Sequence, residues 1–211
     1  MNVFASLLGR RPSRERPDLA AWLGDASPVL VIDGDGSGPA FPGARVLRHE
    51  TSGAPGLPFH FPDARRLPFA AGEFRAVVLA GVIDEVIDAG AAIDEARRVI
   101  AKGGLLLVEQ TVAPEDFEDR AIWNAIAGMR DARHASTPSG RQFAAMISGL
   151  MMEVVREASW EEDADPSATL RPGVADRLAR MLAAAAARGA TDVVRDGALV
   201  VTRRASLLRR G

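Results

Sequence analysis

The sequence contains no cysteine among its 211 residues. This absence excludes disulfide bonds, thiolate metal sites and cysteine nucleophiles. Only three histidines are present, and they are scattered along the chain, so no metal-binding cluster is evident. We therefore expect a protein without a metal cofactor.

Long hydrophobic runs are also missing. No uninterrupted apolar stretch approaches the roughly 18 residues that a membrane-spanning helix needs. The opening MNVFASLLGRR places its apolar residues before its arginines, which is the reverse of the charge order in a signal peptide. We therefore expect a cytoplasmic protein. The formal net charge of -2 gives no global electrostatic case for a nucleic-acid partner.

Hydrophobic residues make up 47% of the chain and charged residues 26%, which is the composition of a globular protein. Both ends are rich in arginine: Arg10, Arg11, Arg14 and Arg16, then Arg203, Arg204, Arg209 and Arg210. These clusters suit either contact with an anionic surface or solvated tails. We expect a flexible arm over residues 1–17, a single domain over 18–204 and a basic tail over 205–211.

Apolar runs alternate with helical patterns along the chain. Residues 28–33, 74–80 and 105–109 are near-continuous apolar runs, typical of strands buried on both faces of a parallel sheet. Further strands are expected at 44–50, 59–61, 152–160, 192–195 and 198–203, and helices at 17–24, 89–100, 115–131, 139–150 and 173–188. This alternation predicts an α/β fold with a mostly parallel, Rossmann-like sheet.

Two glycine-containing segments predict where elements end. Lys102-Gly103-Gly104 is expected to end the helix over 89–100, with glycine supplying the left-handed cap. Asp196-Gly197 predicts a turn between two extended segments, which would give the sheet an antiparallel C-terminal edge.

The first candidate site follows the first buried run. Ligands of open α/β sheets bind beyond the carboxyl ends of the strands. Asp33 ends this run, and Gly34, Gly36 and Gly38 come directly after it. Glycines let the backbone approach a ligand closely, and the acid can accept hydrogen bonds from an ammonium or hydroxyl group. A plain glycine turn is the alternative interpretation.

Two more acids follow later strands. Glu50 ends the second strand. In nucleotide-binding α/β folds an acid about 20 residues after the first turn accepts hydrogen bonds from ribose hydroxyls. Asp63-Ala64 follows the third short strand, where an aspartate can accept a hydrogen bond from an adenine amino group. A solvated acid at a strand end is the alternative for Glu50.

The segment DARRLPFAAGEF, residues 63–74, resembles the DAxxLPFxxxxF segment of class I methyltransferases that depend on S-adenosylmethionine (SAM). VVLAGVIDEVID then resembles that family's fourth strand and loop, and GAAIDEARRVIAKGGLLLVEQT resembles its helix, glycine turn and fifth strand. NAIAGMRDARHAS resembles the N…RDPSHVR stretch of the small-molecule subgroup that includes ubiquinone and menaquinone biosynthesis. Residues 60–160 match in order and spacing, and residues 28–50 match in outline.

The resemblance implies a sheet of about seven strands with helices on both faces and an antiparallel last strand. It also implies SAM as the cofactor. On this basis Gly34, Gly36 and Gly38 would line the methionine part, Glu50 the ribose, Asp63 and Ala64 the adenine, and Ala80 and Gly81 the sulfonium. Methyl transfer from a sulfonium needs alignment and dehydration more than it needs a strong acid.

His134 is the candidate general base, because histidine titrates near neutral pH and this one follows the charged pair Arg130-Asp131. A surface or structural histidine is the alternative. Asp84 and Glu85 stand where relatives often carry histidines, so with Arg130 they would line the substrate mouth. As solvated loop acids they would have no such role.

Three features depart from the family. Pro39, Pro42 and Gly43 interrupt the helix expected after the glycine turn, and TSGAPGLP replaces a second helix. Arg75 stands where relatives usually have an aspartate, and its charge would be unfavourable near the sulfonium, although its long stem could carry the charge away. The sheet should therefore lack helices near the N-terminus, leaving an apolar face for the arm or a second subunit to cover.

Two hypotheses follow. In the first, the protein is an enzyme that transfers a methyl group from SAM to oxygen, carbon or nitrogen of a small molecule. In the second, it is a non-catalytic methyltransferase-like protein, a homodimer or a partner subunit, whose SAM site is weak or absent. A nicotinamide-binding domain is a third alternative, but the glycine spacing lacks the third glycine that opens the helix in such domains.

Overall fold

The computed structural model describes residues 12–34, 39–48, 67–84, 88–131, 134, 136–167, 170 and 172–211. The chain divides into two compact units. Unit 1 comprises Met1–Arg16, Thr111–Ala145 and Ser159–Arg204, and unit 2 comprises Pro17–Gln110, Met146–Ala158 and Ala205–Gly211.

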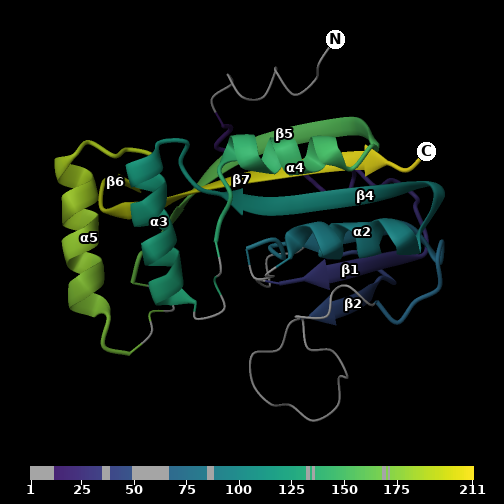
Figure 1. The fold of residues 1–211 in the computed structure, drawn as a ribbon, viewed down its shortest axis with the longest axis horizontal. Coiled ribbons are helices and arrows are strands. Elements are labelled where there is room, and N and C mark those ends of the chain that lie inside the picture. Colours follow the sequence, from purple (N-terminus) through teal and green to yellow (C-terminus); the bar gives the residue numbers. More distant parts are fainter. Residues whose placement is uncertain are drawn as a thin grey trace. The chain divides into compact units, whose positions relative to one another are not determined.

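The described residues form a seven-stranded sheet with the order β2-β1-β3-β4-β7-β5, and β6 pairs with β7 (Figure 1). The strands are β1 (Val29–Asp33), β2 (Arg45–Arg48), β3 (Phe74–Ala80), β4 (Ile100–Val112), β5 (Glu153–Ala164), β6 (Val194–Arg195) and β7 (Ala198–Arg209). Strands β1 to β4 pair in parallel, whereas β6 and β7 pair antiparallel. The predicted Rossmann-like, mostly parallel sheet with an antiparallel C-terminal edge is therefore confirmed.

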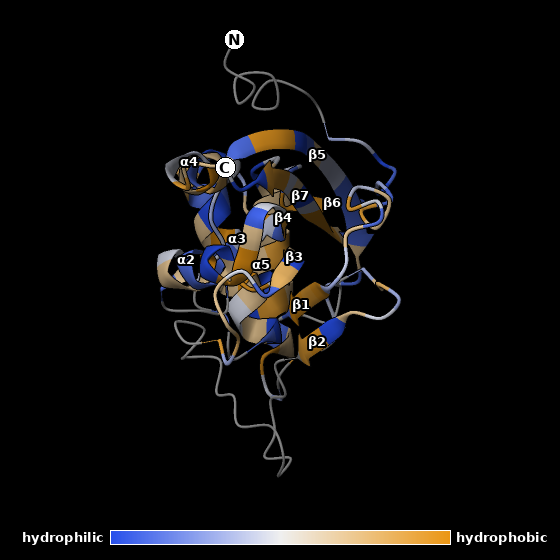
Figure 2. Ribbon diagram, turned by 90° about the vertical axis from the view of Figure 1, so that its right-hand side faces the viewer, coloured by the Kyte–Doolittle hydropathy of each residue, from blue (hydrophilic) through white to orange (hydrophobic). Residues whose placement is uncertain are grey.

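The centre of unit 2 is apolar because its strands are nearly continuous hydrophobic runs. All five residues of β1 are buried, and in β3 Arg75 is the one exposed residue. Figure 2 shows β1 mostly in the hydrophobic colour. Helix α2 (Ala89–Val99) packs against β3 and buries Ala92, Ile93, Ala96 and Val99, which lie on one helical face.

Helix α2 ends one residue before its expected end, and the expected glycine cap is wrong. The helix ends at Val99, and Ile100 is already extended and begins β4. Phe74 pairs with Ile100 but Ala76 pairs with Leu105, so the intervening residues of β4 form a bulge. Gly103 does have the expected left-handed backbone, with φ +73, but it lies inside this bulge and not at a helix cap.

Unit 1 contains α3 (Phe117–Arg130), α5 (Ala175–Ala187) and the first residues of α4 (Gly140–Gly149). Trp123, Ile126 and Met129 of α3 are buried in one apolar cluster with Leu178 and Ala185 of α5. The Asp196-Gly197 turn joins β6 to β7 as predicted, and both of its residues have positive φ.

The two ends of the chain differ from expectation. In the arm, Ser13 exchanges backbone hydrogen bonds with Ser159 and Glu161 of β5, so residues 12–16 are attached to a strand. The predicted basic tail over 205–211 is also wrong, because β7 continues through Arg209 and its residues Ala205–Leu208 are buried. Three apolar residues in this stretch favour burial over solvation.

Residues 19–25 form consecutive turns with i to i+3 hydrogen bonds, at Trp22 and Leu23, where a short helix was expected. In the described residues 39–48 there is no helix, and β2 begins at Arg45. Both observations agree with helices being depleted near the N-terminus. The expected strand at 59–61 lies outside the described residues. None of the helices in the described ranges is long and apolar enough to cross a membrane.

Candidate functional site

The carboxyl ends of three neighbouring strands of unit 2 are aligned in one row. Asp33 of β1 pairs with Ala80 of β3, and Ala80 pairs with Glu109 of β4. Paired residues of parallel strands point to the same face of the sheet. Because neighbouring strands lie about 4.8 Å apart, the backbones of Asp33 and Glu109 are roughly 10 Å apart. Only the methyl side chain of Ala80 lies between the two acids in this row.

Both acids of this row are buried: Asp33 is 4% exposed and Glu109 is 0% exposed. The chain is also held firmly just beyond the strands. The Gly34 N–H donates to the Ala80 carbonyl at 2.8 Å, and the Gly81 N–H donates to the Glu109 carbonyl at 3.0 Å. Gly81 has φ +58, a left-handed conformation that glycine adopts without strain. This edge therefore presents two buried carboxylates on a rigid backbone.

Gln110 follows Glu109 in β4, so it adds a polar group at the same edge but on the opposite face of the sheet. It is 0% exposed, and its Oε1 accepts a hydrogen bond from the Ile83 N–H at 3.0 Å. This contact fixes the orientation of the amide. Its Nε2 is buried without a hydrogen-bond partner among the residues that the structure describes. A buried donor of this kind is costly, so it is suited to an acceptor atom of a ligand or to an ordered water.

The structure brings four of the expected cofactor residues together. Asp33, Gly34, Ala80 and Gly81 all lie at this edge of unit 2, and the half-buried Asp84 follows them after three residues. The other expected residues, Gly36, Gly38, Glu50, Asp63, Ala64 and Glu85, lie outside the described residues. Sequence reasoning missed Glu109 and Gln110, although Glu109 ends a buried apolar run in the same way as Asp33.

His134, the expected base, belongs to unit 1. It is half-buried, and its Nε2 lies 2.9 Å from Oδ1 of Asn124 on α3. The rings of His134 and Trp123 meet edge to face with centroids 6.4 Å apart. Trp123 is itself anchored, because its Nε1 donates to the Val200 carbonyl at 3.1 Å. The ring of His134 is therefore held in a defined orientation.

Arg130, expected at the substrate mouth, is the last residue of α3 and is half-buried. Burial lowers the pKa of its guanidinium, and the negative charge of Asp165 opposes that shift. Arginine stays charged at physiological pH even so, which leaves Arg130 suited to an anionic or carbonyl group. No group of three or more metal-ligating side chains occurs within the described ranges.

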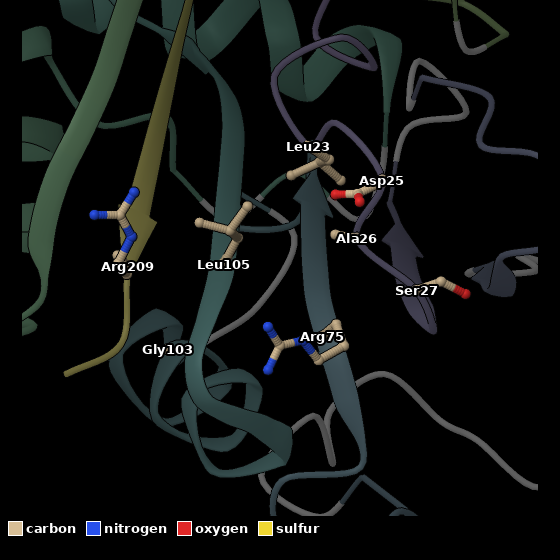
Figure 3. Close-up of a pocket in the computed structure, with 8 residues that line it drawn as sticks. All are labelled: Leu23, Asp25, Ala26, Ser27, Arg75, Gly103, Leu105 and Arg209. Carbon is tan, nitrogen blue, oxygen red and sulfur yellow. The ribbon is translucent and has the colours of Figure 1, made fainter.

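The expectation for Arg75 is wrong. Arg75 is the second residue of β3, at the amino end of the strand, whereas Ala80 is at the carboxyl end. Its exposed side chain lines a cavity of about 350 Å³ together with Asp25, Leu105 and Arg209. Figure 3 shows Arg75 and Arg209 on either side of Leu105. The arginine charge therefore does not count against a cofactor at the carboxyl edge.

A parallel sheet with polar residues at its carboxyl edge is the class of α/β protein in which ligands bind at that edge, and residues 35–108 match the family model described as a methyltransferase domain. A demethylmenaquinone methyltransferase of Beutenbergia cavernae is 36% identical over 107 residues, which are 51% of this chain and 45% of that protein. The chain thus spans less than half the length of this curated relative.

Solved structures share the fold. A candidate methyltransferase of Bacillus halodurans has a TM-score of 0.65 at 16% identity, covering 86% of this chain and 82% of that chain. The YcgJ protein of Bacillus subtilis has a TM-score of 0.58 at 18% identity, covering 80% and 72%. These two structures show the fold. The sequence matches confirm the resemblance to class I SAM-dependent methyltransferases and to their menaquinone-related subgroup.

The residues at the carboxyl edge fit SAM chemically. SAM carries a sulfonium and an ammonium group, and buried carboxylates favour nearby cations. SAM also carries a carboxylate and ribose oxygens, any of which can accept a hydrogen bond from a buried amide such as Gln110 Nε2. Ala80, which stands between the two acids of the row, has only a methyl side chain.

Proposed function

We propose that this protein transfers the methyl group of SAM to a small-molecule acceptor, and that the carboxyl edge of β1, β3 and β4 holds the cofactor. The row Asp33–Ala80–Glu109 is the observation that carries the proposal, because it combines two buried carboxylates with a small residue between them. SAM supplies a methyl group activated by a positively charged sulfur. The two acids stabilise that charge in a region that excludes water.

The proposal assigns a role to each candidate residue. Asp33 and Gly34 hold the methionine part of the cofactor, and Ala80 and Gly81 lie beside the sulfonium. The family resemblance adds Gly36, Gly38, Glu50, Asp63 and Ala64 for the rest of the cofactor. The same resemblance assigns Asp84, Glu85 and Arg130 to binding of the acceptor, and His134 to removal of the acceptor's proton. These assignments rest on the matching motifs and on the buried acids of the row.

The acceptor class comes from the matched relative, which is named a demethylmenaquinone methyltransferase. A reduced naphthoquinone is therefore the first acceptor that we would assay. The ring of such a molecule is apolar and its hydroxyl groups are acidic, so a base that removes a proton would help it react. A cytoplasmic location and the lack of a nucleic-acid partner belong to the same proposal and rest on composition.

One observation favours the non-catalytic alternative. The described residues 39–48 contain no helix, so the helix N-terminus that could bind the methionine carboxylate is missing from them. This loss would weaken SAM binding. A homodimer belongs to this alternative, and a sedimentation mass of twice the chain mass would support it.

Calorimetric titration tests the proposal. SAM and S-adenosylhomocysteine (SAH) share every group except the methyl, so SAM alone has a charged sulfur. We expect Asp33→Asn and Glu109→Gln each to weaken SAM binding by about tenfold to a hundredfold, the worth of a hydrogen bond to a charged group. Their effect on SAH should be smaller. Asp25→Asn is the matched control, because this exposed acid lines the cavity at the other end of the sheet.

The outcomes separate the hypotheses. If the wild-type protein binds neither ligand at millimolar concentration, the non-catalytic alternative is correct. If it binds SAM, but both variants bind SAM as tightly as the Asp25→Asn control does, the cofactor does not contact the row. Thermal unfolding without ligand identifies a variant that has simply lost its fold.

A further inference from the structure

A cavity of about 350 Å³ lies beside the amino end of β3 in unit 2, and the proposed function does not use it. The turns before β1, the bulge of β4 and the end of β7 complete its walls. Its volume is at the small end of the roughly 300–1,000 Å³ that ligand sites occupy. Arg75 precedes Ala80 by five residues, or about 16 Å along β3, so the cavity is distinct from the row Asp33–Ala80–Glu109.

Backbone hydrogen bonds fix two walls of this cavity. The Gly103 N–H donates to the Arg210 carbonyl at 2.8 Å, and the Arg210 N–H donates to the Gly104 carbonyl at 2.9 Å, so the end of β7 is attached to the bulge of β4. On the other side, the Ala26 N–H donates to the Leu23 carbonyl at 3.1 Å and closes a turn. A ligand that binds between preformed walls does not have to order them, which lowers the cost of binding.

Arg75 and Asp25 bring opposite charges to the cavity. Both side chains are exposed, and neither makes a hydrogen bond or an ion pair with any residue in the described ranges. Figure 3 shows them apart, with Asp25 on the turns before β1 and Arg75 on β3. Arg209 differs, because its Nη1 lies 3.1 Å from Oε2 of Glu153. The cavity therefore offers a ligand one cation and one anion that other side chains do not occupy.

A ligand with both charges fits this pair better than a ligand with one. A guanidinium binds a carboxylate through two parallel hydrogen bonds, and the carboxylate of Asp25 can accept hydrogen bonds from an ammonium group. A ligand that fills the cavity removes water from both side chains, and a charge that loses water without gaining a partner costs free energy. Leu23, Ala26 and Leu105 line the same cavity and suit a hydrocarbon part between the charged groups.

We propose that this cavity binds a small zwitterion of the amino-acid type, whose carboxylate pairs with Arg75 and whose ammonium group pairs with Asp25. The hydrocarbon part of the ligand contacts Leu23 and Leu105. A ligand in this place is too far from Ala80 to receive a methyl group there, so the cavity is a second binding site. It does not depend on the proposed function.

Three related probes test the two charges separately. L-leucine carries both charged groups, 4-methylpentanoate is leucine without the ammonium group, and 3-methylbutylamine is leucine without the carboxylate. Titration of the whole chain, followed by calorimetry and by NMR chemical shifts, measures the affinity for each. We expect wild-type protein to bind leucine at least about threefold more tightly than either analogue, which is the worth of one exposed ion pair.

Two variants should give opposite patterns. Arg75→Gln should weaken binding of leucine and 4-methylpentanoate but not of 3-methylbutylamine. Asp25→Asn should weaken binding of leucine and 3-methylbutylamine but not of 4-methylpentanoate. Lys102→Gln is the matched control, because it removes an exposed cation next to Gly103 that does not line the cavity. General damage to the fold would affect all three probes alike, so it cannot produce this pattern.

Three results would overturn the inference. The first is a wild-type protein that does not bind leucine at millimolar concentration. The second is equal affinity for leucine and both analogues. The third is an Arg75→Gln variant that binds all three probes as the Lys102→Gln control does. If Arg75→Gln does not fold, the wild-type affinities and the Asp25→Asn pattern decide the question.

A titration with SAH present separates this site from the cofactor site, because SAH itself contains an amino-acid part. Leucine should bind with the same affinity in the presence of saturating SAH, since about 16 Å of strand separates Arg75 from Ala80. Competition between the two would place leucine in the cofactor site and refute the proposal. If the wild-type protein binds neither SAM nor SAH, the proposed function has failed, whereas the leucine titration still decides whether the cavity is a site.

Discussion

Gly104 is the residue whose replacement should damage the sheet of unit 2 most directly. A Cβ atom at this position would lie 2.7 Å from Ile100 Cγ2, 2.8 Å from the Arg75 carbonyl oxygen and 2.9 Å from the Ala101 carbonyl oxygen. Two of these three atoms belong to the backbone, which cannot rotate away as a side chain can. Gly104→Ala must therefore push β3 and β4 apart locally.

The cost can be worked out from these contacts. Overpacking a close-packed site costs about 1–3 kcal/mol, and backbone clashes place Gly104→Ala near the upper end of that range. For a chain of this size each kcal/mol lowers Tm by about 2–4 °C, so Tm should fall by roughly 6–12 °C. The measurements are urea unfolding and thermal unfolding followed by circular dichroism.

Gly103 is the matched control because its cost has a different origin. No atom lies within 4 Å of a Cβ built there, but its φ of +73 is left-handed. Gly103→Ala should cost roughly 1–2 kcal/mol of backbone strain, and Gly103→Asn less, because asparagine tolerates this conformation. Gly104→Asn should be at least as harmful as Gly104→Ala. If asparagine is tolerated equally at both positions, the steric argument is refuted.

Two further substitutions test other parts of the structure. Gly128→Ala should raise the free energy of unfolding by roughly 0.5–1 kcal/mol, because alanine favours a helix and the new methyl would make only an ordinary contact with His134; a loss of stability would show that the ring lies closer to α3. The hydrogen bond from Arg98 lowers the pKa of Glu95 from its ordinary value of 4.5. The ionised Glu95 therefore stabilises the folded protein above about pH 4.5, and this stabilisation is lost as the pH falls through the lower pKa that Glu95 has in the folded state. Glu95→Gln should therefore destabilise the protein in urea unfolding at neutral pH, with a difference that shrinks in acid, and an equal difference at both pH values would contradict this account.

Much of the candidate site could be predicted from local pattern. Asp33 ends a buried apolar run and is followed by glycine, which marks the carboxyl end of a parallel strand. The same rule would have found Glu109, which follows the run LLLV. It would also have placed Arg75 correctly, because the second residue of a strand lies at its amino end. Strand direction alone is therefore sufficient to place both residues.

Asn124 could not have been found in this way. It lies ten residues before His134, and the sequence between them does not indicate that the chain turns back onto α3. The contact exists because Thr137 binds both ends of the same amide, which holds the returning segment against the helix. Such a cluster depends on backbone positions that only folding creates.

The sequence by itself determined the class of fold and the sheet's central strands, because the hydrophobic period and the residues at strand ends are local properties. The tertiary structure decided the rest. It made Asp33 and Glu109 members of one row by setting the register of β1, β3 and β4. It also placed the bulge at Gly103 and Gly104 inside a strand, where backbone pairing with β3 outweighed the local preference for a helix cap.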